Sequence, residues 1–353
     1  MRGKKVNSKT IFIGPTGGGK MPSNGASIKN SFILDSLYRH NIPIYHIDTE
    51  RWKIDPRILL KLFFVILFHR KSRYILSLNS ISAARLIRFL HAIGIEDIVY
   101  WVIGGRLPQM IEERILPLSI YKNLRKIFVE GISMKTRMEN MGIHNIEVVP
   151  NFKHIPTFPT NDILTKKDDT IRYVFLSRIT KEKGCSLIFQ AIKLLKSQKT
   201  RPFSVSFYGP IEKEYKKEFM ELLQGESLAS YEGFLDLRKS ENYKTLLGFD
   251  AFLFPTFWQG EGFPGVFIDA FAVGLPVLAS DWSMNSEVVQ PEITGFLYPS
   301  HNAKALADAM LQIQSSERNT MRVLCREKAR QYDVENVLNE TFLKELIQPS
   351  PNN

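Results

Sequence analysis

Short apolar runs alternate with longer helix-like runs along the first half of the chain. The first apolar run leads into a Gly-rich loop, and a helix is expected after this loop, over about residues 26–39. Strands that alternate with helices in this way predict a parallel sheet with crossover helices. The strands expected in this half are 10–14, 44–47, 73–78, 98–103, 126–129 and 146–149.

The same alternation begins again in the second half, after a stretch at 155–170 that is rich in Pro, Thr, Asp and Lys. Such a composition between two periodic segments is typical of a linker. Beyond it the sequence predicts a strand at 172–177, a helix over 186–196, and further strands at 204–208 and 251–254.

The two series of strands predict an α/β chain with two doubly wound, Rossmann-like domains. Ligands of open α/β sheets bind beyond the carboxyl ends of the strands. Two such domains facing each other would therefore form a binding cleft. We expect a first domain at 1–155, a linker at 156–170, a second domain at 171–335, and a C-terminal helix and tail at 336–353.

Composition indicates the size of the cores and the redox environment. The 353 residues, of which 44% are hydrophobic, are enough for two domains with cores of their own. The only two cysteines, Cys185 and Cys325, are far apart in sequence. This argues against a disulfide framework and a Cys-based zinc site, and it suits a reducing compartment. The basic N-terminus precedes no long apolar run, so we expect no signal peptide and a cytoplasmic location.

Net charge is distributed unevenly between the two halves. Residues 1–160 hold 24 Lys and Arg against 11 Asp and Glu, a net charge of +13, while the remainder holds 23 against 25, a net charge of −2. A basic first half indicates an anionic partner, either nucleic acid or an anionic membrane. Because the sequence has no zinc-finger or RNA-binding aromatic signature, we expect no nucleic acid. We expect instead peripheral contact with the inner face of the cytoplasmic membrane.

Residues 58–68 form a strongly apolar run flanked by Arg57, Arg70, Lys71 and Arg73. The run is too short to span a bilayer as a helix. The favoured interpretation is a buried crossover helix. The alternative is an interfacial helix with basic flanks.

Residues 257–281 carry two carboxylates around a Gly-Phe-Pro-Gly turn. Glu261 opens the turn, and Asp269 lies in the helix-like run that follows it. A helix N-terminus, with free N–H groups and a positive dipole end, favours a bound phosphate. Carboxylates beside it can accept hydrogen bonds from sugar hydroxyls. The alternative is that both acids are only dipole partners of the helix.

A basic segment, 177–184, lies between an expected strand and an expected helix. Its Arg178 and Lys183 could close on a diphosphate leaving group, because positive charge placed where negative charge develops lowers the barrier to departure. The alternative is that both side chains are solvated loop residues.

In their order along the chain, these segments resemble the retaining nucleotide-sugar glycosyltransferases of family 4, the group 1 glycosyl transferases, which have the GT-B fold. The resemblance covers roughly residues 170–335. It implies two Rossmann-like domains facing across a cleft, with the acceptor side first and the donor side second. The matching segments are Ser-Arg-Ile-Thr-Lys-Glu-Lys-Gly at 177–184, Val-Ser-Phe-Tyr-Gly-Pro at 205–210, Tyr-Glu-Gly-Phe-Leu at 231–235, Glu-Gly-Phe-Pro-Gly-Val-Phe-Ile-Asp at 261–269, Gly-Leu-Pro-Val-Leu-Ala-Ser at 274–280, Glu287, and Thr-Gly-Phe-Leu-Tyr at 294–298.

The resemblance also implies a role for individual positions. Arg178 and Lys183 would hold the donor diphosphate and Glu261 would contact the donor sugar, so these three are the expected catalytic residues. The implied donor contacts are the amides of Phe263, Gly265 and Val266 with phosphate or sugar, Asp269 with the ribose, the loop around Phe234 with the base, and Asn24 and Gly25 with the donor phosphates. The final segment, 334–347, is expected to be a helix that packs back on the first domain.

The activity implied is transfer of a sugar, with retention, from a UDP or GDP donor to a glycan or lipid-linked glycan acceptor. Surface polysaccharide biosynthesis is the expected setting. The nucleotide sugar is a substrate, and no cofactor and no metal ion are expected, because Arg, Lys and helix dipoles would replace a divalent cation.

Two departures from the family's pattern concern the site. The second acid is Asp269 where Glu is usual, which shortens its reach to the ribose. The segment Tyr-Trp-Val-Ile-Gly-Gly at 100–105 stands where many relatives have a His on the acceptor side, so we assign no catalytic His. Gly104 and Gly105 could let the backbone approach a substrate on the acceptor side, but glycine pairs more often only form turns.

Three other functions are alternatives to this one. A sugar-nucleotide epimerase of the same fold would need acids and a His set that the sequence does not place. A binding protein without turnover stays open because of Asp269. The loop from Gly14 to Lys20 resembles a P-loop, but Met21 replaces the hydroxyl that magnesium needs and Pro22 interrupts the next helix, which argues against an NTPase.

Overall fold

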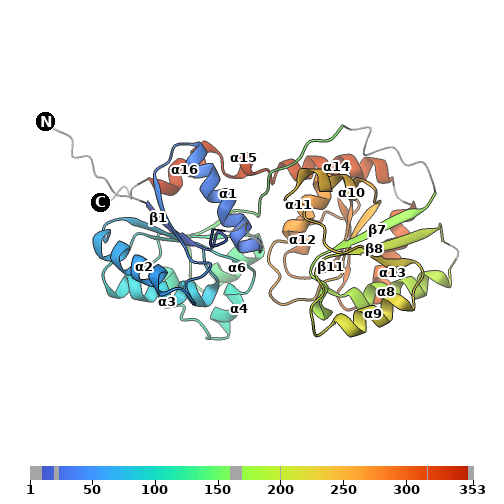
Figure 1. Cartoon of the computed structure of the whole chain (residues 1–353), viewed down its shortest axis with the longest axis horizontal. Helices are drawn as coiled ribbons and strands as arrows, with labels where there is room; N and C mark the ends of the chain where they lie inside the picture. Colours follow the sequence, from blue (N-terminus) through green and yellow to red (C-terminus); the bar gives the residue numbers. More distant parts are fainter. Residues whose placement is uncertain (1–9, 20–23, 160–168, 199, 316, 349–353) are drawn as a thin grey trace. The chain divides into compact units, whose positions relative to one another are not determined.

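The structure is a computed structural model in which two compact units each contain a parallel sheet (Figure 1). Unit 1 comprises 1–153 and 334–353, and unit 2 comprises 154–333. The α/β fold with two doubly wound sheets, expected from the apolar runs, is confirmed. The residues described by the structure are 10–19, 24–159, 169–198, 200–315 and 317–348.

The sheet of unit 1 has six described strands in the order β2-β1-β3-β4-β5-β6, all parallel. Every strand expected in this half is present, although β3 and β4 end two residues before their apolar runs do. The strands are β1 (Thr10–Gly14), β2 (Ile44–Asp48), β3 (Arg73–Leu76), β4 (Ile98–Trp101), β5 (Lys126–Val129) and β6 (Ile146–Val148).

The helices of unit 1 lie on both faces of this sheet. The chain crosses from β1 to β2 in one direction and then from β2 through β3 to β4 in the other. Right-handed crossovers therefore place α1 (Gly25–Arg39) on one face, and α2 (Pro56–Phe68) and α3 (Ser80–Ala92) on the other (Figure 1). The shorter helices that follow are α4 (Leu107–Glu112), α5 (Ser119–Lys122) and α6 (Ile132–Asn140).

The C-terminal segment completes the core on the α1 face of unit 1. Helices α15 (Val334–Val337) and α16 (Glu340–Ile347) pack with α1 and with alternate strand residues, and Leu343 is fully buried among them. The expected packing of this segment on the first half is confirmed. It forms two helices rather than one, because Asn339 is extended and caps α16, accepting a hydrogen bond from the amide of Phe342 at 3.0 Å.

The sheet of unit 2 has six described strands in the order β12-β11-β10-β7-β8-β9, again all parallel. The strands are β7 (Ile171–Leu176), β8 (Phe203–Tyr208), β9 (Ala229–Tyr231), β10 (Ala251–Phe254), β11 (Val277–Asp281) and β12 (Gly295–Pro299). The helices are η1 (Lys181–Lys183), α8 (Cys185–Lys196), α9 (Lys216–Gln224), η2 (Ser240–Asn242), α10 (Tyr243–Leu247), α11 (Gly265–Ala272), α12 (Asn285–Val288), α13 (Ala303–Ser315) and α14 (Arg318–Arg330).

The strand order of unit 2 reverses between β7 and β10. From β7 the chain runs outward through β8 to β9, then returns to the other side of β7 and continues through β10 to β12. Helix α8 packs with α13 on one face of the sheet, and α11 packs with α14 on the other (Figure 1). The carboxyl ends of β7 and β10 therefore lie at a topological switch point, where open α/β sheets hold their ligands.

The Gly-rich loop after β1 closes on a carboxylate of its own unit. Asp48, at the end of β2, accepts hydrogen bonds from the amides of Thr16 and Gly18 at 3.0 and 2.8 Å, and from the Thr16 hydroxyl at 2.7 Å. Burial acts to raise the pKa of Asp48, but these bonds and one from the amide of Glu50 lower it overall. These donors are therefore occupied by Asp48 rather than open to a phosphate. Residues 20–22 of the P-loop-like motif lie outside the described residues.

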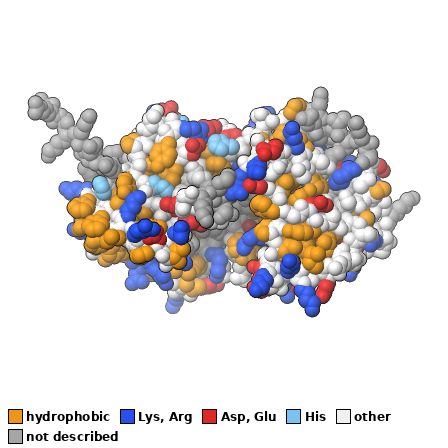
Figure 2. Space-filling model, in the orientation of Figure 1, with side chains coloured by type: hydrophobic (Ala, Val, Ile, Leu, Met, Phe, Trp, Pro, Cys, Tyr) orange, Lys and Arg blue, Asp and Glu red, His pale blue; other side chains and the backbone are white. Residues whose placement is uncertain are grey.

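Helix α2 is buried on one face only, which corrects the favoured interpretation of the apolar run. Leu62, Val65 and Ile66 are buried, but the remaining large apolar side chains after Ile58 are between 46% and 74% exposed. Figure 2 shows hydrophobic side chains gathered on the surface at this helix. The exposed side chains are Leu59, Leu60, Phe63, Phe64, Leu67 and Phe68.

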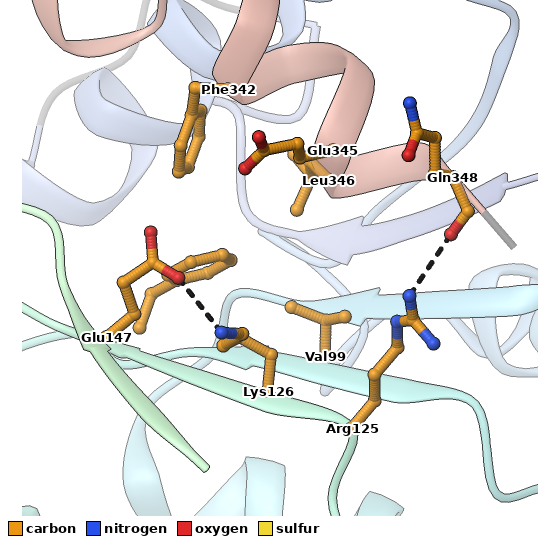
Figure 3. A pocket seen from close by; sticks show the side chains of 9 residues that line it. Val99, Arg125, Lys126, Glu147, Phe342, Glu345, Leu346 and Gln348 are labelled. Atoms are coloured by element: carbon orange, nitrogen blue, oxygen red, sulfur yellow. Dashed lines mark hydrogen bonds and ion pairs between the residues drawn. The ribbon is translucent and has the colours of Figure 1, made fainter. Parts of the chain in front are cut away.

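A hollow of about 260 Å³ lies in unit 1 between α16 and the sheet (Figure 3). On its sheet side Lys126, the first residue of β5, is paired with Glu147 of the neighbouring strand β6 at 3.0 Å. Arg125 donates to the backbone oxygen of Gln348 at 3.2 Å. Because the hollow includes the amino end of β5, it does not coincide with the carboxyl-end crevice where such sheets bind ligands.

Candidate functional site

Three loops of unit 2 converge at its switch point. They follow β7, β10 and β11, which are neighbours in the sheet, so the loops leave it side by side at the same end. Arg178 and Lys183 lie in the first loop and Glu261 in the second. The structure thus brings together the three residues expected to be catalytic, although 78 positions separate Lys183 from Glu261.

Gly184 allows the first two loops to approach each other. Its φ is 75°, and a Cβ at this position would lie 2.1 Å from the carbonyl oxygen of Pro255. Only glycine fits both the left-handed backbone and the close approach. A hydrogen bond of 2.8 Å from the amide of Phe257 to the carbonyl of Glu182 fastens the same two segments. Lys183 is therefore held directly against the loop after β10.

Lys183 and Glu261 form a buried ion pair where these loops meet. Lys183 Nζ lies 2.5 Å from Glu261 Oε2, and the two side chains are 7% and 9% exposed. The Thr256 hydroxyl donates to the same carboxylate oxygen at 3.0 Å. Removing one partner of a buried pair leaves an uncompensated charge and costs about 3–5 kcal/mol. The pair therefore fixes a cation and a carboxylate in place at the switch point.

Trp258 presents its aromatic ring to both basic residues. Lys183 Nζ lies 4.9 Å from the ring centroid, and Arg178 Cζ lies 5.4 Å from it. A cation–π contact orients a cation without neutralising its charge. Arg178 is also exposed to solvent, so its guanidinium is positioned and available to an incoming anion.

The loop after β10 is fastened to the next strand and its loop. Each fastening bond is donated by a side chain near the end of β11 to a backbone oxygen of the β10 loop. Groups supported in this way hold their geometry before a ligand binds. The bonds run from Ser280 Oγ to Thr256 at 2.5 Å, from Trp282 Nε1 to Trp258 at 2.8 Å, and from Ser283 Oγ to Glu261 at 2.7 Å.

Helix α11 begins at this loop and adds backbone donors. Among the described residues, the amides of Gly265 and Val266 have no acceptor within the protein, and no side chain caps the helix. Such amides, with the positive end of the helix dipole, favour an anion. The Phe263 ring instead packs on Tyr332, with centroids 5.1 Å apart. Thus the side chain of Phe263 serves packing, and only its backbone remains a candidate contact.

Asp269 is placed inside unit 2, in the middle of α11. Its side chain is buried, and one carboxylate oxygen accepts a hydrogen bond from the hydroxyl of Tyr243 at 2.6 Å. Burial, with the negative charge of Asp269, raises the pKa of Tyr243 far above its usual value. The Tyr243 hydroxyl therefore stays protonated and orients the carboxylate.

Phe234 lies in the loop after β9 and is 65% exposed. The carbonyl of Gly233 accepts a hydrogen bond of 2.8 Å from the amide of Gly209, which ties this loop to the end of β8. A large exposed aromatic ring at the carboxyl end of a sheet can stack on a planar ligand.

The remaining site residues expected from the sequence belong to unit 1. The side chain of Asn24 caps α1, accepting from the Ser27 amide at 2.9 Å, and Gly25 is the first residue of this helix. Gly104, with φ of 80°, and Gly105 follow β4. All four lie beyond the carboxyl ends of strands of unit 1, and the roles expected for them stay predictions.

Two residues of the site were not assigned from the sequence. Thr256 and Trp258 follow β10 directly, and the Thr-Phe-Trp sequence after an apolar strand was their only signal. The contacts of Trp258 with Lys183 and Arg178, and the hydrogen bond of 3.4 Å from the Thr256 hydroxyl to the carbonyl of Glu182, depend on β7 pairing with β10, which no local pattern reveals. Over the part of the chain that the structure describes, no group of three or more His, Cys, Asp or Glu is placed to hold a metal ion.

Residues 159–332 match the profile of the family described as Glycosyl transferases group 1. Two curated relatives match over a similar length. The amylovoran biosynthesis glycosyltransferase AmsK of Erwinia amylovora is 28% identical over 167 residues, 45% of this chain and 40% of the relative. The putative colanic acid biosynthesis glycosyltransferase WcaL of Escherichia coli is 28% identical over 187 residues, 50% of this chain and 45% of the relative. The matches thus span less than half the length of these relatives.

Solved structures resemble nearly the whole chain. HepE of Anabaena in complex with UDP has a TM-score of 0.70 at 16% identity, covering 96% of this chain and 99% of that one. Sucrose-phosphate synthase of Thermosynechococcus elongatus has a TM-score of 0.73 at 16% identity, covering 95% and 97%. At this identity the likeness establishes the fold, which is GT-B.

Proposed function

We propose, from the premise that this chain belongs to the group 1 glycosyl transferases, that it moves a sugar from a UDP or GDP donor to an acceptor with retention of configuration. The observation that carries the proposal is the buried Lys183–Glu261 pair at the β7–β10 switch point, beside the uncapped start of α11. Cations and free amides suit a diphosphate, and a fixed carboxylate suits sugar hydroxyls.

We assign the donor contacts by the chemistry that each position offers. Arg178, Lys183 and the amides of Gly265 and Val266 would bind the diphosphate. Glu261 would accept hydrogen bonds from the sugar. The backbone of Phe263 would face phosphate or sugar, Asp269 would bind the ribose, and Phe234 would stack on the base.

The chemical step requires stabilisation of the departing diphosphate. Negative charge develops on the leaving oxygen as the glycosidic bond breaks, and preorganised donors aimed at that oxygen lower the barrier. In this structure Lys183 is already fixed by Glu261 and by the Trp258 ring, so it needs little reorganisation when the charge develops. The acceptor hydroxyl would attack the anomeric carbon on the face that the diphosphate leaves, and its proton would pass to the departing phosphate oxygen. These charges would act in place of a divalent cation.

The acceptor is proposed to be a glycan or a lipid-linked glycan, at the inner face of the cytoplasmic membrane. Of the two relatives named above, one is named as a glycosyltransferase of amylovoran biosynthesis and the other as a putative glycosyltransferase of colanic acid biosynthesis. Surface polysaccharide biosynthesis is therefore the setting we propose for this chain.

Trp258→Ala should weaken nucleotide diphosphate binding by about tenfold. Both Arg178 and Lys183 would lose the ring that orients them, and one partly desolvated cation–π contact contributes about 0.5–2 kcal/mol, where about 1.4 kcal/mol is a factor of ten. Calorimetric titration would measure the dissociation constant. Trp258→Phe keeps an aromatic face and should lose less affinity. Equal affinity in wild type and Trp258→Ala would contradict the role given to the ring.

Direct titration with UDP, GDP and ADP in the presence of EDTA tests the proposed function. We expect one nucleotide to bind without metal, and Arg178→Ala to weaken that nucleotide selectively. Binding of none would refute the donor site. Incubation with the matching nucleotide sugar then separates the alternatives: an epimerised donor would indicate an epimerase, and binding with neither transfer nor hydrolysis for any acceptor would indicate a protein without turnover.

A further inference from the structure

We propose that α2 is an interfacial helix that binds the surface of an anionic lipid membrane through its exposed apolar face and its basic flanks. The inference concerns a surface of unit 1 and does not depend on the function proposed for unit 2.

The apolar face of α2 is continuous and open. Leu59, Leu60, Phe63, Phe64, Leu67 and Phe68 recur as adjacent pairs every four residues. At 100° per residue they cover an arc about 180° wide on the outer side of the helix. The rings of Phe64 and Phe68 are stacked, with centroids 6.3 Å apart and planes at 8°. Large apolar residues gathered in one exposed patch mark an interaction site, because soluble surfaces rarely gather them.

The rim of this face is strongly basic. Six Lys and Arg residues and one carboxylate occur between positions 51 and 71. The carboxylate, Asp55, is already paired with Arg57 at 3.0 Å. Helix α3 follows on the same face of the sheet and exposes Arg85 and Arg88. Figure 2 shows Lys and Arg side chains beside the hydrophobic ones at this surface.

The charge pattern selects an anionic membrane among the possible occupants. Apolar side chains flanked by cations match lipid tails below anionic head groups. A second copy of the chain, docked by a two-fold axis on the same face, would instead bring two basic rims together. The helix would lie in the interface rather than cross it, since its 13 residues extend about 20 Å and a bilayer core is about 30 Å thick. None of the helices in the described ranges is long and apolar enough to span a membrane.

The cysteines of this chain make a site-specific test practical. Cys185 and Cys325 are its only cysteines, both are buried, and burial raises the pKa of each thiol. A thiol-reactive, polarity-sensitive fluorophore should therefore label Phe68→Cys selectively, with Ile115→Cys as a control at an exposed loop position of unit 1. Vesicles of phosphatidylcholine with about one-third phosphatidylglycerol are the probe, and pure phosphatidylcholine vesicles are the neutral reference.

We expect the label at Phe68→Cys to shift to the blue on anionic vesicles, and the label at Ile115→Cys not to shift. In vesicle sedimentation, Phe64→Ser combined with Phe68→Ser should weaken binding by about tenfold or more. The control pair Ile115→Ser with Ile293→Ser, also exposed, should not. Lys53→Gln with Lys71→Gln should weaken binding to anionic vesicles at low salt by about tenfold, and high salt should remove this difference.

Three results would overturn the proposal. The first is equal vesicle binding by the α2 variants and the control variants. The second is vesicle binding without a spectral shift at Phe68→Cys, which would place the contact elsewhere. The third is a concentration-dependent dimer, seen by sedimentation and broken by the serine substitutions, which would assign the face to a second copy of the chain. Each variant is first checked for wild-type thermal unfolding, so that loss of folding is not taken for loss of binding.

Discussion

Lys183→Met is expected to lower the turnover of the donor by about two orders of magnitude or more, the scale of removing one preorganised electrostatic stabiliser. The side chain keeps its length under Trp258 but loses the charge that would face the departing diphosphate. The change also leaves Glu261 buried without its cation, which should lower the free energy of unfolding by about 3–5 kcal/mol. Steady-state nucleotide release and thermal unfolding measure the two effects separately.

A second substitution separates catalysis from stability in this test. Lys183→Met combined with Glu261→Gln removes both buried charges and keeps an acceptor for the Thr256 hydroxyl, so stability should recover while turnover stays low. Lys181→Met is the matched control, because Lys181 lies in the same short turn but is exposed. Near-normal turnover in the stable double variant would contradict the role proposed for the pair.

Gly184→Ala is expected to destabilise unit 2 strongly. The new Cβ would lie 2.1 Å from the carbonyl oxygen of Pro255, so the loops after β7 and β10 would have to separate. We expect the free energy of unfolding to fall by more than about 4 kcal/mol, or the variant to fail to fold, which is the range of the most damaging single substitutions. Thermal and denaturant unfolding would measure the loss.

Gly233→Ala provides the control for the backbone conformation. Its φ of 81° is close to the 75° of Gly184, but a Cβ there would meet nothing within 4 Å. It should therefore cost only the strain of a left-handed residue, about 1–2 kcal/mol. If the two variants were equally stable, close approach of the loops at Gly184 would not be what requires glycine.

The strands could be predicted because their apolar runs are local signals. Each of the six runs in the first half became a strand of one parallel sheet, and the second series did the same. The exposure of the outer face of α2 could not be predicted in this way. A short apolar run has the same sequence pattern whether only one face of the helix or the whole helix is buried. Exposure depends on what packs over the helix, and among the described residues Phe68 remains 74% exposed.

Those residues of the candidate site that lie within short sequence motifs could be predicted, but the contacts between distant segments could not. Arg178, Lys183 and Glu261 were found from two short segments, and the structure joins them. The role of Trp258 was missed because its ring contacts residues of the loop after β7, a strand that is distant in sequence but paired with β10. The partner of Asp269 could not be predicted for the same reason. Its carboxylate accepts a hydrogen bond from Tyr243 of α10, which lies 26 residues earlier in the chain.

The central claim is tested most directly by measuring nucleotide release from UDP-, GDP- and ADP-sugars in EDTA, for the wild type, Arg178→Ala and the double variant Lys183→Met with Glu261→Gln. The account predicts slow hydrolysis of one donor without metal, and its loss in both variants. Hydrolysis that persists in the variants would contradict it, as would a wild-type protein that neither binds nor hydrolyses any of these donors.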